Sequence, residues 1–125
     1  MNPIDYIIVA LKMIVSLSIL NVWLIQPNKP TKWRGGKAKN IFEEFEVYGL
    51  SKILCYIIGF LKVSLAIILF ASIHFTELSL IGSLGLSILL LGSIGMHFKI
   101  KDPLYKSFPA FLFTLMNLLI AYLSL

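Results

Sequence analysis

The chain has 125 residues, of which 58% are hydrophobic and only 14% are charged, and its mean hydropathy is +0.91. An ordinary soluble domain carries roughly 25% charged residues, which help to cover its large exposed surface. The composition excludes a soluble enzyme, a nucleic-acid-binding domain and a disordered tail. We therefore interpret the net charge of +5 as a signal of membrane topology.

Four apolar segments predict four membrane-spanning helices, because a helix needs about 20 mainly apolar residues to cross a bilayer core. They extend over residues 4–25, 50–72, 77–98 and 108–125. The first lacks a basic n-region and a small-residue cleavage site, so it is expected to be a retained membrane helix rather than a signal peptide. The sequence predicts a single membrane domain over residues 1–125, folded as an all-α, antiparallel four-helix bundle.

The connecting segments differ in charge. The positive residues of the first and third connections are Lys29, Lys32, Arg34, Lys37 and Lys39, and then Lys99, Lys101 and Lys106. The short second connection has no lysine or arginine. Because short loops rich in Lys and Arg face the cytoplasm, residues 26–49 and 99–107 are predicted to be cytoplasmic, with both termini outside. The candidates for contact with anionic lipid head groups are Lys29, Lys32, Lys37 and Lys39.

A short amphipathic helix is predicted over residues 40–48, within the first connection. Asn40 and Glu43 have the spacing of a capping box, and Gly49 is a typical stop signal. Apolar residues recur at i, i+4 and i+7, at Ile41, Phe45 and Tyr48. This pattern is typical of a helix that lies in the membrane interface. The alternative is a solvated connector.

Small and polar residues form a stripe along each predicted helix, and such stripes mark protein-facing surfaces in membranes. The predicted helix-packing face of the third segment consists of Gly82, Gly85, Gly92 and Gly95, next to a serine stripe. Depth along the helices, at 1.5 Å per residue, places Lys12 and Lys62 about 12 Å and Asn117 about 15 Å below the outer edge. These three residues are therefore predicted to share one layer, and intramembrane lysines are candidates for function.

Each ionisable candidate also has a simpler interpretation. Lys12 could extend to the membrane surface, and Lys62 could pair with a backbone carbonyl or with Asn117. His97 could handle a proton or contact a ligand, or it could be a cation at a helix C-terminus. His74 and His97 lie roughly 30 Å apart, so one protomer cannot use both to ligate a haem. No metal site is predicted, and the single Cys55 is expected to be a small hydrophobic residue.

Several motifs together resemble the DoxX-like family of small membrane proteins. They are Asn21–Trp23, Asn28–Gly36, Glu43–Phe45, Tyr48–Leu50, Gly59–Val63, Met96–Pro103 and Lys106–Ala110. The resemblance implies a four-helix membrane fold. It also implies an association with membrane redox systems, since founding relatives are linked to quinone-dependent sulfur oxidation and others to oxidative-stress defence, while distant relatives are chaperones. It draws attention, without catalytic roles, to Lys29, Arg34, Glu44, Lys62, His97, Lys99 and Asp102.

The sequence therefore predicts an accessory subunit, or a bundle that binds a hydrophobic ligand such as a quinone or a lipid. The ligand-contacting candidates are Lys62, His97, Lys12, Asn117, Trp33, Arg34 and Glu44. No catalytic residue is assigned, because the chain has no self-contained catalytic motif, and whether it is an enzyme stays open. The alternative is an assembly factor or chaperone that binds partner helices, or a second copy of the chain, through the glycine face of the third segment.

Overall fold

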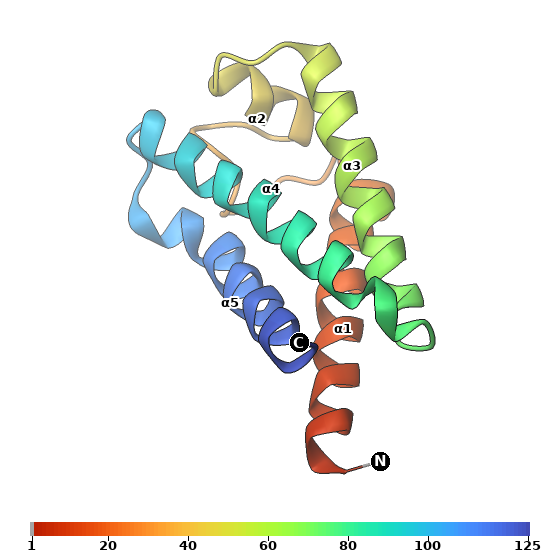
Figure 1. The fold of residues 1–125 in the computed structure, drawn as a ribbon. Helices are drawn as coiled ribbons and strands as arrows, with labels where there is room; N and C mark the ends of the chain where they lie inside the picture. Colours follow the sequence, from red (N-terminus) through yellow and green to blue (C-terminus); the bar gives the residue numbers. More distant parts are fainter. Residues whose placement is uncertain (1) are drawn as a thin grey trace.

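The computed structural model describes residues 2–125, and within that range all regular structure is helical. The long helices are α1 (Pro3–Leu20), α3 (Lys52–Ala71), α4 (Ser79–Lys99) and α5 (Phe108–Leu123) (Figure 1). The shorter elements are the π-helical η1 (Asn21–Ile25), α2 (Ile41–Val47), and the 3₁₀ turns η2 (Thr76–Leu78) and η3 (Leu104–Ser107). Together these make four helices long and apolar enough to cross a membrane, which confirms the predicted all-helical membrane fold.

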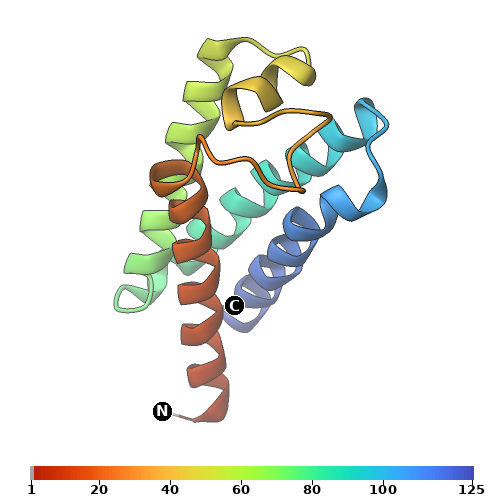
Figure 2. The ribbon, with the colours of Figure 1, turned by 180° about the vertical axis from the view of Figure 1, so that it is seen from behind.

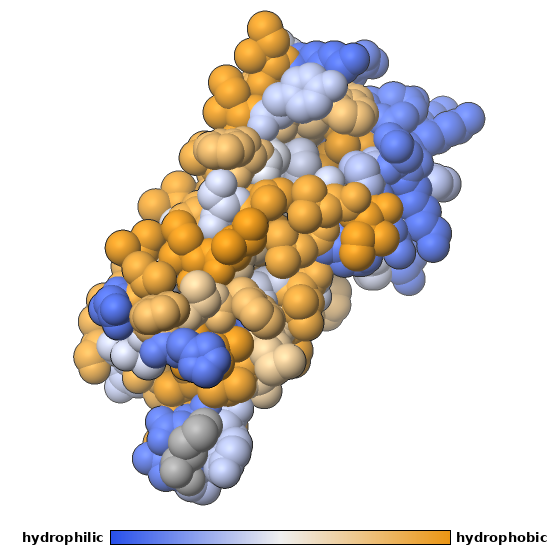
Figure 3. Space-filling view, turned by 90° about the vertical axis from the view of Figure 1, so that its right-hand side faces the viewer, coloured by the Kyte–Doolittle hydropathy of each residue, from blue (hydrophilic) through white to orange (hydrophobic). Residues whose placement is uncertain are grey.

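The long helices run alternately toward and away from the end that carries α2 (Figure 1). Helix α4 packs against α3 and α5, and α1 packs against the same two helices. The buried core between them consists of Val15, Ile19, Ala66, Leu69, Leu86 and Ile120. On the face seen in Figure 3, hydrophobic residues cover the middle of the molecule, as expected for a surface in contact with lipid chains.

The two charged connections pack together at one end of the molecule. Gly36 N–H donates to Asp102 Oδ1 (3.0 Å), Lys106 Nζ donates to the Gly36 carbonyl oxygen (2.6 Å), and Lys99 Nζ donates to the Tyr48 carbonyl oxygen (3.0 Å). Figure 2 shows the segment before α2 crossing this end toward α5. The two basic loops therefore lie on the same side of the bundle.

Helix α2 begins and ends close to the predicted positions. Asn40 is its N-cap, and the Asn40 side chain accepts from Glu43 N–H at 2.8 Å. The reciprocal half of the predicted capping box is wrong, because the Glu43 carboxylate accepts from the Asn40 side-chain amide instead of its backbone N–H. Gly49, at φ +81°, follows the helix, and Leu50 N–H donates to the Phe45 carbonyl oxygen across this turn. The location of α2 in the membrane interface stays a prediction.

The predicted common layer of Lys12, Lys62 and Asn117 is wrong. Lys12 Nζ donates to Ser79 Oγ (2.8 Å), at the start of α4, whereas Lys62 Nζ donates to Ser93 Oγ (3.0 Å), about 21 Å further along that helix. Lys12 is only 3% exposed, so it does not extend to the surface either. Asn117 is fully buried and its side chain donates to the carbonyl oxygen one turn back in α5.

The glycines of α4 fall into two pairs. A Cβ added to Gly82 would lie 3.0 Å from Leu69 Cα, and one added to Gly85 would lie 2.8 Å from Leu65 Cδ2, so these glycines permit close contact with α3. A Cβ on Gly92 or Gly95 would meet no atom within 4 Å. Half of the predicted packing face is thus used inside the molecule, and the other half is open.

Candidate functional site

Two adjoining cavities lie at the end of the bundle that carries the basic loops. Their volumes are about 200 Å³ and about 320 Å³. The residues that line both are Val22, Trp23, Arg34, Glu44, Tyr48, Lys62 and Ser93. Five of these seven, namely Arg34, Glu44, Tyr48, Lys62 and Ser93, carry a polar or ionisable side-chain group. Mostly apolar walls with a few convergent polar groups are typical of a ligand-binding pocket.

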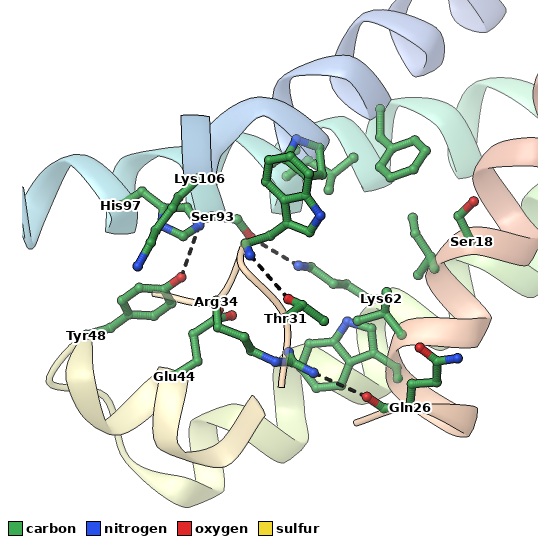
Figure 4. Close-up of a pocket in the computed structure, with 18 residues that line it drawn as sticks. Ser18, Gln26, Thr31, Arg34, Glu44, Tyr48, Lys62, Ser93, His97 and Lys106 are labelled. Atoms are coloured by element: carbon green, nitrogen blue, oxygen red, sulfur yellow. Dashed lines mark hydrogen bonds between the residues drawn. The ribbon is translucent and has the colours of Figure 1, made fainter. Parts of the chain in front are cut away.

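Lys62 extends from α3 into this region (Figure 4). It is 8% exposed, and its Nζ atom donates to Ser93 Oγ and lies 5.6 Å from the centroid of the Trp23 ring. Within residues 2–125, no carboxylate oxygen lies within 4.0 Å of Lys62 Nζ. An ammonium group has three N–H donors, so Lys62 retains the capacity to bind a further acceptor.

Arg34 lines the smaller cavity together with Lys62 and is also buried. Its Nη2 atom donates to the carbonyl oxygens of Gln26 (3.2 Å), Pro27 (3.3 Å) and Lys29 (3.2 Å), which fixes the loop that precedes α2. In the described part of the chain, Arg34 Nε is buried and has no hydrogen-bond partner. An unsatisfied buried donor is uncommon and costs free energy, so a cavity beside it is a natural place for an acceptor.

Glu44 is the only carboxylate among the residues that line the two cavities. It comes from α2, and its Oε2 atom accepts from Gly35 N–H at 2.7 Å. The N-cap at Asn40 sets the start of α2 and therefore the direction of this side chain. With Lys62 and Arg34 opposite a single carboxylate, the cavities carry an excess of positive charge and of donors.

Tyr48, His97 and Asp102 form a hydrogen-bonded chain at the rim of the smaller cavity. His97 Nδ1 donates to Asp102 Oδ2 at 2.7 Å, because an ionised carboxylate can only accept. In the neutral imidazole, His97 Nε2 is then the acceptor for the Tyr48 hydroxyl at 3.4 Å. Burial and, after it, the nearby Glu44 carboxylate raise the pKa of Tyr48, so its hydroxyl stays protonated at neutral pH. The arrangement can hold and orient a proton next to a bound ligand.

Trp23 is held in place by two local features. It lies in η1, where Gln26 N–H donates to the carbonyl oxygen of Asn21, five residues back. Such π-helical turns are frequent at functional sites. Its ring packs where Gly59 of α3 lacks a side chain, since a Cβ on Gly59 would lie 2.6 Å from Trp23 Cζ3.

Substituting Gly59→Ala should displace the Trp23 ring and destabilise the protein by about 1–3 kcal/mol, because the added methyl group has no space. Thermal unfolding in detergent and the position of the tryptophan emission maximum measure the two effects. Gly92→Ala is the matched control. A Cβ there meets nothing, so this change should be neutral or stabilising by up to about 1 kcal/mol. Equal unfolding temperatures for both variants would contradict the packing argument.

The structure gathers most of the ligand-contacting residues predicted from the sequence. Those that line the smaller cavity are Lys62, His97, Trp33, Arg34 and Glu44. Lys12 and Asn117 line neither cavity. The four lysines predicted to contact lipid head groups (Lys29, Lys32, Lys37 and Lys39) are all exposed.

Sequence analysis did not assign Tyr48, Ser93 or Asp102 to a ligand site. Tyr48 belongs to the apolar face predicted over residues 40–48, and Ser93 belongs to the serine stripe beside the predicted packing face of the third segment. Asp102 follows His97 by five residues, and this spacing is a usable signal. It places an acid just beyond a helix end, where the chain can turn back on the last helical turn. Tyr48 and Ser93 carry no comparable signal, because their roles depend on how α2, α3 and α4 pack.

Comparison with families of known proteins gives a match over most of the chain. The sequence profile of the DoxX-like family matches residues 34–121, a range that includes Arg34, Glu44, Lys62 and His97. No curated protein and no solved structure matches this chain.

Proposed function

This chain belongs to the DoxX-like family, and from that premise we propose that it is a membrane subunit that binds a quinone in the cavities around Lys62. In this proposal it acts as an accessory part of a membrane redox system. The head group occupies the cavities at the basic-loop end, and the basic loops 26–49 and 99–107 face the cytoplasm, where their exposed lysines contact anionic lipid head groups.

The observation that carries the proposal is the pair of buried donors with spare capacity. Lys62 Nζ has one hydrogen-bond acceptor and Arg34 Nε has none in the described chain, and both residues line both cavities. A quinone ring is flat and apolar, with two carbonyl oxygens that only accept. It therefore suits a slot with an aromatic wall at Trp23 and donors nearby.

The proposal predicts that the protein binds quinone with a direct optical signal. Both tryptophans of the chain, Trp23 and Trp33, line the smaller cavity, so a bound quinone should quench the tryptophan emission in a saturable way. Titration with a ubiquinone in detergent measures this. Extraction of the protein purified in a mild detergent should also release a quinone. Unsaturable quenching, together with no quinone or lipid above the level of an unrelated membrane protein, would contradict the proposal.

A second candidate function is that of an assembly factor that binds a membrane helix of another protein or of a second copy. Gly92 and Gly95 favour it, because both are exposed on α4 and a Cβ added to either would meet no atom within 4 Å. Small residues of this kind allow two membrane helices to approach closely. A partner helix on this face would contact both glycines, whereas a cavity-bound ligand concerns only Gly92, which lines the larger cavity.

A further inference from the structure

Helices α3 and α4 form a V. They meet at the turn that joins them and diverge toward the end that carries α2 (Figures 1 and 2). Near the turn they are in tight contact through Gly82 and Gly85. Further along α4, Gly92 faces open space, with no atom within 4 Å of an added Cβ. The two helices are therefore separated in the half of the bundle that contains the cavities.

The larger cavity fills this separation. It is lined by Leu54 and Ile58 on α3 and by Ile88 and Gly92 on α4. Ile88 is 69% exposed and Gly92 is exposed as well, so these residues belong at once to the cavity wall and to the outer surface of the bundle. Both lie well inside the membrane-spanning range Thr76–Lys99. The outer surface at this level faces lipid chains rather than water.

The same cavity reaches the polar groups of the site, since Arg34, Glu44 and Lys62 also line it. One continuous space thus has a polar inner end and an apolar outer end that opens on the bilayer. A ligand that fits both ends has a compact head with hydrogen-bond acceptors and a long apolar chain. The charge of the inner end, with two cations and one carboxylate, favours acceptor oxygens on that head.

We infer that the gap between α3 and α4 at Gly92 is a lateral portal, through which a long-chain isoprenoid quinone enters from the bilayer. The head group lies at Lys62 and Arg34, and the isoprenoid chain leaves between Ile58 and Ile88. This inference rests on the proposed function and adds the long isoprenoid chain of the ligand and its route. Gly92 lies at the mouth of the portal, because it lines the cavity and a Cβ added there would meet no atom within 4 Å.

The test compares Gly92→Phe with Gly95→Phe in liposomes, using saturable quenching of tryptophan emission. Both glycines are exposed, and a Cβ added to either would meet no atom within 4 Å, but only Gly92 lines the cavity. The probes are a ubiquinone with a long isoprenoid chain, present in the lipid, and the same head group without a chain, added from water. Gly92→Phe should weaken binding of the long-chain quinone by about tenfold or more, which corresponds to about 1.4 kcal/mol. It should leave binding of the chainless head group unchanged, and Gly95→Phe should alter neither.

Three outcomes would overturn the inference. If Gly92→Phe binds the long-chain quinone as the unchanged protein does, the chain does not pass Gly92. If both variants weaken it equally, the face contacts a partner helix or a second copy and is not a portal. If the unchanged protein binds neither probe, the quinone site itself is absent, and the proposed function fails together with the portal. A site without a portal is recognised when all three proteins bind both the long-chain quinone and the chainless head group normally.

Discussion

Replacing Lys62 with methionine is expected to weaken quinone binding by roughly tenfold to a hundredfold, because a hydrogen bond from a charged donor contributes about 1.5–3 kcal/mol. Methionine has a similar length and is apolar, so it can occupy the same space beside Trp23 without a donor. The quenching titration in detergent measures the change in affinity. Thermal unfolding of the same sample shows whether the four-helix fold is retained.

The fold should tolerate this substitution. The hydroxyl of Ser93, which loses the Lys62 donor, still donates to the Leu89 carbonyl oxygen one turn back. Burying a charged group in a membrane protein is costly, and the removal of Lys62 also removes that cost. A folded Lys62→Met protein with unchanged quinone affinity would show that Lys62 does not contact the ligand. A protein that unfolds at a much lower temperature would show that its role is structural.

The helices could be predicted from the sequence because each depends on a local property. Long apolar segments bordered by charged or turn residues are sufficient to indicate membrane helices. The end of α2 at Gly49 follows from the conformational freedom of glycine at positive φ. These features need no knowledge of how the helices pack, and the structure places them within a few residues of the predicted positions.

The relative positions of Lys12 and Lys62 could not be predicted in this way. The depth calculation treats each helix as a straight rod across the bilayer with its end at a common edge. In the structure α3 and α4 form a V and α1 continues into the π-helical η1, so equal residue counts do not give equal depths. The two lysines differ in their hydrogen-bond partners: Lys12 donates to Ser79 and Lys62 donates to Ser93. Which serine each lysine reaches depends on how the helices pack.

The loop residues of the site were predicted from the basic charge of the loop and from the family resemblance, not from hydropathy. Residues 26–40 have no helical or strand periodicity, so hydropathy says nothing about where Arg34 lies. Its position depends on three backbone carbonyl oxygens that the loop folds around its guanidinium group. Part of the functional proposal rests on Arg34 Nε, which has no hydrogen-bond partner in the described chain. That feature can be recognised only in the folded loop.

Substituting Lys12→Met should give the opposite result to Lys62→Met, a loss of stability with no change in quinone binding. Lys12 Nζ donates to the Ser72 carbonyl oxygen (2.9 Å) and to Ser79 Oγ (2.8 Å), and all three residues are buried. Ser72 is the C-cap of α3, so this lysine caps the negative end of that helix and ties α1 to the turn between α3 and α4. Methionine would leave the buried carbonyl oxygen without its donor.

The expected cost is about 1–3 kcal/mol in the free energy of unfolding, which thermal or denaturant unfolding in detergent can measure. Lys62→Met is the matched control, since the same chemical change is made at the other buried lysine. Of these two lysines, Lys12 donates a hydrogen bond to the α3–α4 turn, whereas Lys62 lines the cavities. If Lys12→Met weakened quinone binding at unchanged stability, the two lysines would act on one ligand. The separation of about 21 Å along α4 argues against this, because a quinone head group cannot span that distance.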